Sequence, residues 1–381
     1  MIEKRSVVLG CLLSALSVAT AHGAAAQYRL IDLGDLPGGV NTSAAWGIND
    51  AGQVVGHSRD ATGQRAVSFF TDGRDPVAVA ATSSTAYAVS NGGLIVGSHG
   101  SIVHGYSTIV GAATAMDLGD LAGGSNYSVA TGVNDAGTIV GYSSGTSPNG
   151  GSTIRAVAWS SGGTVRDLGS LNDGTANAGS SSYANDINNN GQIVGYSSAA
   201  GGQRAFVLSG GVMTDLGTLP GESASRAQAL NDDGVIVGSS GRFATLWDGS
   251  GIHRIDAVAA ATGPAVAYDI NDSGTVVGQV RTGSGNQAFV WDTQGGMSLF
   301  TQLLIGGEGW TVTDARAINE SGWIAGTAMY TAGDISYSHA VLLQPVPLPG
   351  AAWLLLSGFG LLMAAKRRLT PSSDSTVALP A

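Results

Sequence analysis

A nine-residue pattern recurs along this chain of 381 residues. Ile48-Asn-Asp-Ala-Gly-Gln-Val-Val-Gly56 returns as Val133-Asn-Asp-Ala-Gly-Thr-Ile-Val-Gly141 and as Ile270-Asn-Asp-Ser-Gly-Thr-Val-Val-Gly278. Aligned on the glycine that closes its polar turn, the pattern occurs seven times, at Gly52, Gly93, Gly137, Gly191, Gly234, Gly274 and Gly322. The spacings are 41, 44, 54, 43, 40 and 48 residues, and an alanine always stands three residues before the residue that opens the unit. Self-similarity at a nearly constant spacing indicates a repeat architecture.

Each unit has room for four short strands, because an apolar strand such as Arg204–Leu208 and often an Asp-Leu-Gly strand follow the pattern. This predicts an all-β fold, a seven-bladed β-propeller. The seventh unit lacks its Asp-Leu-Gly strand, whereas Tyr28–Gly34 carries one, so we expect this N-terminal strand to close the ring beside Ser338–Leu343. The alternative is a β-solenoid of about 45-residue units.

The repeated turn has a physical explanation of its own. Its glycine accepts a positive φ, and its asparagine side chain is expected to bond the backbone two residues on. Before the turn, alternate positions are small, as at Ser43, Ala45 and Gly47. An innermost strand that is crowded around a narrow axis would need small side chains on one face.

Charge and cysteine content exclude several classes of function. The only cysteine is Cys11, inside a predicted signal peptide, so the mature chain has no disulfide. Between Gln27 and Pro349 there are 12 arginines against 25 acidic residues, a net charge of −13. Such a surface repels nucleic acid and predicts no nucleic-acid partner.

The N-terminal segment 1–26 is predicted to be a secretory signal peptide. Lys4 and Arg5 precede an apolar run, and Ala24 and Ala26 form a small-residue cleavage site before Gln27. The mature repeat domain would then occupy residues 27–344. An uncleaved membrane anchor is the alternative.

No catalytic motif is found, so we predict a protein that is not an enzyme. The six histidines have no metal-ligand spacing, and the aspartates recur at turns, where turn chemistry explains them. No cofactor is expected, although Asn-Asp pairs such as Asn134-Asp135 place calcium-preferring oxygens in turns. The alternatives are therefore a calcium-dependent adhesion module and an extracellular glycan-active enzyme. Four aromatic residues are candidates for stacking on sugar rings: Trp46, Tyr87, Tyr268 and Trp310.

The units resemble the HAF-type extracellular repeat, named for a His-Ala-Phe strand. The matching residues are Ala-x-x-Ile-Asn-x-x-Gly-x-Ile-Val-Gly, Asp-Leu-Gly-x-Leu, and variants of the name-giving strand at Arg204-Ala-Phe206, Gln287-Ala-Phe289 and His339-Ala-Val341. The resemblance covers roughly Tyr28 to Leu343. It implies a secreted bacterial protein, but the family has no established activity.

The C-terminal segment resembles a PEP-CTERM sorting signal of the Val-Pro-Leu-Pro type. A proline-rich segment, 345–349, contains the motif Val346-Pro347-Leu348-Pro349 and is expected to lie clear of the propeller. Residues 350–368 are predicted to be a transmembrane segment that ends in the basic stop Lys366-Arg367-Arg368, before a short cytoplasmic tail, 369–381. Signals of this family usually end soon after the basic cluster, whereas this chain continues to Ala381.

The second resemblance implies a location and a partner. An exosortase-like membrane peptidase of a Gram-negative bacterium would cut a precursor held transiently in the inner membrane. The chain would then reach the cell surface or the exopolysaccharide matrix and act there as a scaffold or binding module. Extracellular polysaccharide and other surface proteins are the expected partners, and a plain C-terminal anchor is the alternative.

Overall fold

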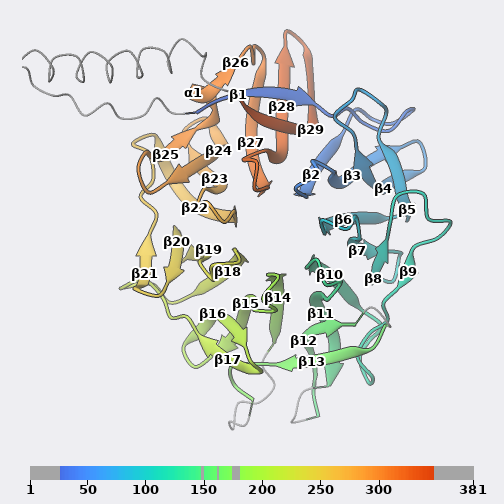
Figure 1. Ribbon diagram of the computed structural model, residues 1–381, viewed down its shortest axis with the longest axis vertical. Helices are drawn as coiled ribbons and strands as arrows, with labels where there is room; N and C mark the ends of the chain where they lie inside the picture. The colour runs from blue at the N-terminus through green and yellow to red at the C-terminus, as the bar shows by residue number, and fades with distance from the viewer. Residues whose placement is uncertain (1–25, 147–149, 161–162, 174–180, 347–381) are drawn as a thin grey trace, which may run out of the picture.

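The computed structural model describes residues 26–146, 150–160, 163–173 and 181–346. These residues form seven sheets of mainly antiparallel strands that surround a central axis (Figure 1). The predicted seven-bladed all-β propeller is thus confirmed, and the β-solenoid alternative is wrong. In blades 1 to 6 the four strands follow one another from the axis to the rim.

The blades have the following strand boundaries. Blade 1 contains β2 (Ser43–Ile48), β3 (Val54–Asp60), β4 (Gly63–Phe69) and β5 (Val77–Thr82), and blade 2 contains β6 (Ser84–Val89), β7 (Ile95–His99), β8 (His104–Thr108) and β9 (Met116–Asp117). Blade 3 contains β10 (Ser128–Val133), β11 (Ile139–Thr146), β12 (Ser152–Trp159) and β13 (Val165–Gly169), and blade 4 contains β14 (Ser182–Ile187), β15 (Ile193–Ala199), β16 (Gly202–Ser209) and β17 (Val212–Asp215). Blade 5 contains β18 (Ser225–Leu230), β19 (Ile236–Ser240), β20 (Phe243–Asp248) and β21 (Gly251–Arg254), and blade 6 contains β22 (Ala261–Ile270), β23 (Val276–Thr282), β24 (Gly285–Asp292) and β25 (Gly296–Leu299).

Blade 7 joins the two ends of the repeat array. It contains β27 (Trp310–Ile318), β28 (Ile324–Ala332), β29 (Ile335–Val346), β1 (Gln27–Asp32) and the short β26 (Leu304–Ile305), which follows α1 (Phe300–Leu303). Strand β1 pairs antiparallel with β29, with Leu30 opposite Leu343, as the sequence predicted. Its Tyr28 is buried against Phe300, with ring centres 5.2 Å apart. The propeller is therefore closed by hydrogen bonds and by apolar packing.

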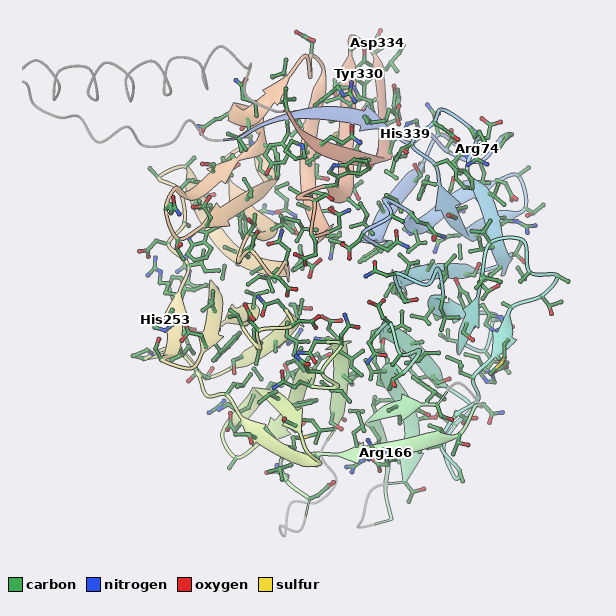
Figure 2. All side chains as sticks on the ribbon, viewed as in Figure 1. Arg74, Arg166, His253, Tyr330, Asp334 and His339 are labelled. Atoms are coloured by element: carbon green, nitrogen blue, oxygen red, sulfur yellow. The ribbon has the colours of Figure 1, made fainter. Side chains whose placement is uncertain are left out.

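A side-chain contact between β29 and β1 supports the same closure. His339 lies on β29 near the β1 strand (Figure 2), and its Nδ1 is 2.9 Å from a carboxylate oxygen of Asp32. By contrast, Figure 2 places Arg74, Arg166 and His253 at the outer rim.

The small residues of the inner strands lie where neighbouring blades pack closely together. All seven repeated alanines, such as Ala45, are fully buried, and Ala45 packs against Ala317 and Ala340 of blade 7. A Cβ on Gly47 would lie 2.9 Å from the carbonyl oxygen of Tyr87 in blade 2. Close approach between blades is what requires small side chains here.

Asp-Leu-Gly segments link four of the blades, blades 7, 2, 3 and 4, to the blade that follows. In blade 4, for example, the Asp215 carboxylate accepts the Gly217 N–H at 2.8 Å, which forms a tight turn. The Gly217 carbonyl then accepts a hydrogen bond from the Ser225 hydroxyl of blade 5, which in turn accepts the Ala205 N–H of blade 4. Equivalent serines bridge other blade pairs: Ser43, Ser84, Ser128 and Ser182.

The terminal predictions fall largely outside the described residues. Ala24, Pro347, Leu348, Pro349, Lys366, Arg367 and Arg368 all lie there. Val346 is the last residue of β29 and pairs with Gln27, so this first residue of the motif lies in the sheet, whereas we expected it clear of the propeller. Within the described ranges, no helix is long and apolar enough to cross a membrane.

Candidate functional site

The repeated turns gather at one end of the central channel. Their seven glycines have φ between 73° and 81°, a region that favours glycine. In blade 1 the Asn49 carbonyl accepts the Gly52 N–H, and the Asn49 side-chain oxygen accepts the Gln53 N–H at 2.9 Å. The asparagine thus bonds the backbone four residues on. The predicted bond to the residue two positions on is found at Asn319, whose Oδ1 accepts the Ser321 N–H.

The same asparagines form a ring of amides that joins the blades. Each donates its Nδ2 hydrogen to the backbone carbonyl of the equivalent residue in the next blade, as Asn231 does to Asn271 at 3.2 Å. Asn319 closes the ring onto Asn49 at 3.0 Å. Six blades contribute to this amide ring: Asn49, Asn134, Asn188, Asn231, Asn271 and Asn319. Blade 2 has Ser90 at this position, a side chain too short to reach the next blade.

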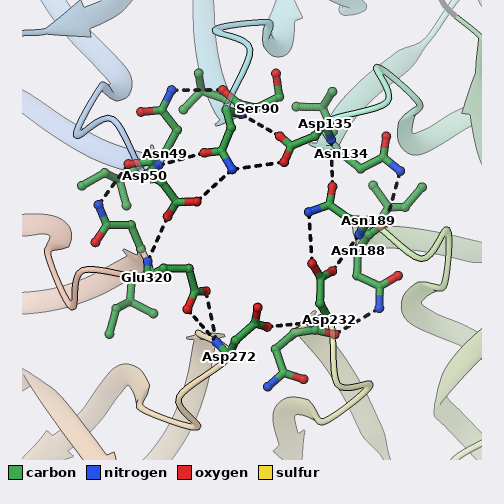
Figure 3. A pocket seen from close by; sticks show the side chains of 18 of the residues that line it. Asn49, Asp50, Ser90, Asn134, Asp135, Asn188, Asn189, Asp232, Asp272 and Glu320 are labelled. Carbon is green, nitrogen blue, oxygen red and sulfur yellow. Dashed lines mark hydrogen bonds between the residues drawn. The ribbon is translucent and has the colours of Figure 1, made fainter.

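One residue further along, a second ring surrounds the mouth of the channel (Figure 3). Each backbone N–H donates to the side-chain oxygen of the equivalent residue in the next blade, as Glu320 does to Asp50 at 3.0 Å. The members of this acidic ring are Asp50, Asn91, Asp135, Asn189, Asp232, Asp272 and Glu320. It contains five carboxylates, and it lines a cavity of about 210 Å³.

The acidic ring bears on the calcium alternative. Its carboxylates accept backbone hydrogen bonds from the preceding blade, which is a structural role. Across the described ranges, no three side chains of the His, Cys, Asp and Glu types lie where they would hold a metal ion. Burial raises the pKa of Glu320, and the nearby Asp272 and Asp50 contribute to this rise. The ring is therefore explained as blade-to-blade hydrogen bonding.

Two further carboxyl groups link blades below this mouth. At the position of Gly47, blades 4 and 6 carry Asp186 and Asp269, whose carboxyls accept the N–H groups of Leu230 and Ile318 in the following blades. Burial raises the pKa of Asp186 to about 6 and that of Asp269 to about 8, with the charge of Asp186 adding to the rise at Asp269. Neither residue lines the cavity of the acidic ring or the second channel cavity, which is described next.

Towards the other end of the channel lies the feature that sequence analysis missed. Every inner strand has a one-residue β-bulge directly after its repeated alanine, as between Ala45 and Gly47 in blade 1. A bulged residue belongs to no ladder pair, so its side chain is free to be aimed elsewhere. The seven bulged residues line one cavity of about 210 Å³: Trp46, Tyr87, Thr131, Asn185, Gln228, Tyr268 and Arg316. We call this set the bulge ring.

The bulge ring combines aromatic faces with polar groups. Arg316 of blade 7 lies over the rings of Trp46 and Tyr268 from its two neighbouring blades, at 4.5 and 4.1 Å from the ring centres. Hydrogen bonds hold both rings: Trp46 Nε1 donates to Nδ1 of His57 at 3.0 Å, and the Tyr268 hydroxyl donates to Gln279 at 2.8 Å. Burial, with the nearby charge of Arg59, lowers the pKa of His57, so its ring is available as a neutral acceptor.

Three of the four aromatic candidates from the sequence meet at this cavity. Trp46 and Tyr87 are in edge-to-face contact, with ring centres 5.7 Å apart, and Tyr268 belongs to the same ring. Trp310 instead packs on Tyr330 and Tyr337 within blade 7. One signal could have grouped the seven residues. The position after the repeated alanine holds large or polar side chains within strands that are otherwise small.

Comparisons with known proteins show no family for this chain. No protein-family model matches the chain, and no curated protein matches it. Among solved structures, the chain is similar to TolB from Acinetobacter baumannii, with 16% identity and a TM-score of 0.44. That match covers 69% of this chain and 65% of TolB, so the chain spans less than two thirds of that protein.

Proposed function

We propose that this protein is an exported, non-catalytic propeller that binds an extracellular polysaccharide, as a surface scaffold or binding module of the cell envelope or its matrix. The bulge ring is the observation that carries the proposal. It brings three aromatic rings, two amides, a hydroxyl and a guanidinium to one solvent-open cavity. Aromatic faces packed beside a few fixed polar groups are typical of small-molecule and sugar sites.

Binding is better supported than catalysis by the positions of the carboxyl groups. General acid–base chemistry on a glycan needs carboxyls beside the bound sugar. The seven residues that line the bulge-ring cavity include no Asp or Glu. The acidic ring lies at the other mouth and is occupied with backbone N–H groups, as at Asp50 and Asp232. The net charge of −13 argues against nucleic acid as the ligand.

The positions of the termini support the processing part of the proposal. Cleavage before Gln27 would remove the signal peptide without shortening β1, which begins at that residue. Cleavage by an exosortase-like peptidase after Val346 would leave β29 whole. Gln27 and Val346 pair with each other, so both predicted cuts lie at one edge of blade 7 and neither would open the ring.

Binding is tested with the propeller, residues 27–346, on an array of bacterial and algal polysaccharides. We expect binding to at least one polysaccharide and a loss of at least ten-fold in affinity for Trp46→Ala and for Tyr268→Ala. Trp310→Ala serves as the control, because this aromatic residue lies outside the bulge ring. No binding to any polysaccharide, or equal losses for the control, would contradict the proposed function.

Sorting is tested with the full chain in a bacterium that has the peptidase. We expect surface-released protein that starts at Gln27 and lacks residues 350–368, as measured by mass spectrometry. Replacing Pro347 and Pro349 with alanine should leave an uncut form in the inner membrane. Wild-type protein that is found only in that membrane would support the plain anchor and refute sorting.

A further inference from the structure

We infer that the bulge ring recognises a carboxylated sugar, and that Arg316 binds the carboxylate. The inference rests on the proposed function and names the class of sugar within it. Arg316 is the only charged residue among the seven that line this cavity. A single cation in a neutral cavity therefore decides which charge a ligand carries.

The Arg316 guanidinium is held in a fixed orientation. Its Nε donates to Asp314 at 3.1 Å, and its planar face lies over Trp46 and Tyr268. Within the described part of the chain, no hydrogen bond joins its two terminal nitrogens to another residue. A guanidinium that is anchored through Nε and stacked on aromatic rings presents its two terminal N–H groups together, the geometry that suits a carboxylate.

The surroundings favour a singly charged group over a phosphate. Asp314 already balances part of the Arg316 charge at 3.1 Å, and no second cation lines the cavity. A doubly charged phosphate would lie near the net negative charge of the propeller with one partly neutralised cation to hold it. A carboxylate would add one negative charge beside the Arg316–Asp314 pair, where a phosphate would add two.

The remaining wall fits the rest of a sugar. Asn185 donates its Nδ2 hydrogen to the Ala227 carbonyl at 2.7 Å, which fixes the amide and leaves its oxygen as an acceptor. Gln228 of the next blade lines the same cavity. Hydroxyl groups of a sugar are donors for these amide oxygens, and Trp46 and Tyr87 give an apolar surface for its C–H face. A peptide that ends in a carboxylate is the competing ligand.

The test compares acidic oligosaccharides with their neutral, carboxyl-reduced counterparts. Oligomers of galacturonate, of alginate and of hyaluronate are each titrated into the propeller beside the same oligomer with its carboxyl groups reduced to alcohols. We expect at least one acidic form to bind about ten- to hundred-fold more tightly than its counterpart, the range for a charged hydrogen-bond pair. Arg316→Gln should remove this preference, and Arg316→Lys should restore part of it.

The control is Arg226→Gln. Arg226 also stacks on an aromatic ring, at 4.8 Å from the centre of Tyr196, but it lies outside the bulge ring and should leave the preference unchanged. Melting temperatures of all variants identify any loss of folding. If neutral and acidic forms bind equally, or if Arg226→Gln acts like Arg316→Gln, the inference is wrong while the proposed function stands. If no glycan binds but a peptide with a free C-terminal carboxylate does, both are wrong.

Discussion

Replacing Asn231 tests whether the amide ring holds the blades together. The side chain is buried, with 4% of its surface exposed, and it forms two hydrogen bonds. Its Oδ1 accepts the Val235 N–H at 2.9 Å within blade 5, and its Nδ2 donates to the Asn271 carbonyl of blade 6 at 3.2 Å. Asn231→Ala leaves the Val235 N–H without its partner, whereas the Asn271 carbonyl loses one of two hydrogen bonds and keeps the Gly274 N–H.

The expected cost follows from this count. The orphaned Val235 N–H costs about 1 to 3 kcal/mol and the lost bond to the Asn271 carbonyl about 0.5 to 1.5, so Asn231→Ala should lower the free energy of unfolding by roughly 1.5 to 4.5 kcal/mol. Asn231→Ser should cost about half as much. In blade 2 the Ser90 hydroxyl accepts the Leu94 N–H at 3.2 Å, so a serine keeps the hydrogen bond within the turn and loses only the bond to the next blade.

The chain also offers the reverse experiment. Ser90→Asn would add the missing amide, within reach of the Asn134 carbonyl, and should raise the free energy of unfolding by about 0.5 to 1.5 kcal/mol. Asn286→Ala is the matched control, because Asn286 is an exposed strand residue and its loss should stay within about 0.5 kcal/mol. Equilibrium urea denaturation measures all four variants. An Asn231→Ala value no larger than the control, or a loss for Ser90→Asn, would refute the reasoning.

Three further outcomes are expected. Deleting residues 27–35 should lower stability by several kcal/mol, because it removes β1 from blade 7 and exposes an edge of β29; a deletion variant that melts like the parent would contradict ring closure. Burial raises the pKa of Asp269 to about 8, so between about pH 4 and 8 its carboxyl keeps a proton in the folded chain that it loses in the unfolded chain. The free energy of unfolding should therefore fall as pH rises through this range, by up to about 1.4 kcal/mol per pH unit. Asp269→Asn should flatten that slope in pH-dependent denaturation, and an unchanged slope would refute the assignment. Gly274→Ala should cost about 1 kcal/mol or more in thermal melts through its φ of 79° alone, because no atom lies near the added Cβ; an unchanged melt would contradict this.

The fold was predictable because the sequence contains one copy of the repeated pattern for each blade. The number of blades follows from the seven alanines and seven turn glycines. The way in which the ring closes follows from the Asp-Leu-Gly strand that the seventh unit lacks and the N-terminal segment carries. These signals are local, since each turn or strand is written in adjacent residues. The neighbours that the small face meets were not predictable, for the opposite reason. Whether Ala45 meets the axis or the next blade depends on the angle between blades, which no single unit contains.

The bulge ring was not predictable as a site for a related reason. A one-residue bulge changes which side of the strand faces the axis, and the alternation of small residues gave no sign of it. Trp46, Tyr87 and Tyr268 were recognised as candidates, but as separate residues more than 40 positions apart. The amide ring was missed because an asparagine in a turn is already explained by its local bond, as at Asn49 and Gln53.

The inner strand and its turn therefore have two roles at separate positions: the turn joins the blades, and the bulge lines the cavity. At the turn, the asparagine and the residue after it bond the next blade, so a substitution such as Asn231→Ala is costly there. The bulged residue forms no ladder pair, so a substitution there breaks no strand pairing. The seven blades carry six different residue types at this position. The backbone bulges in the same place whether the residue is Thr131 or Arg316, so the fold does not dictate the identity of this residue. The specificity that we propose for the bulge ring would therefore be open to change while the turns keep the ring of blades closed.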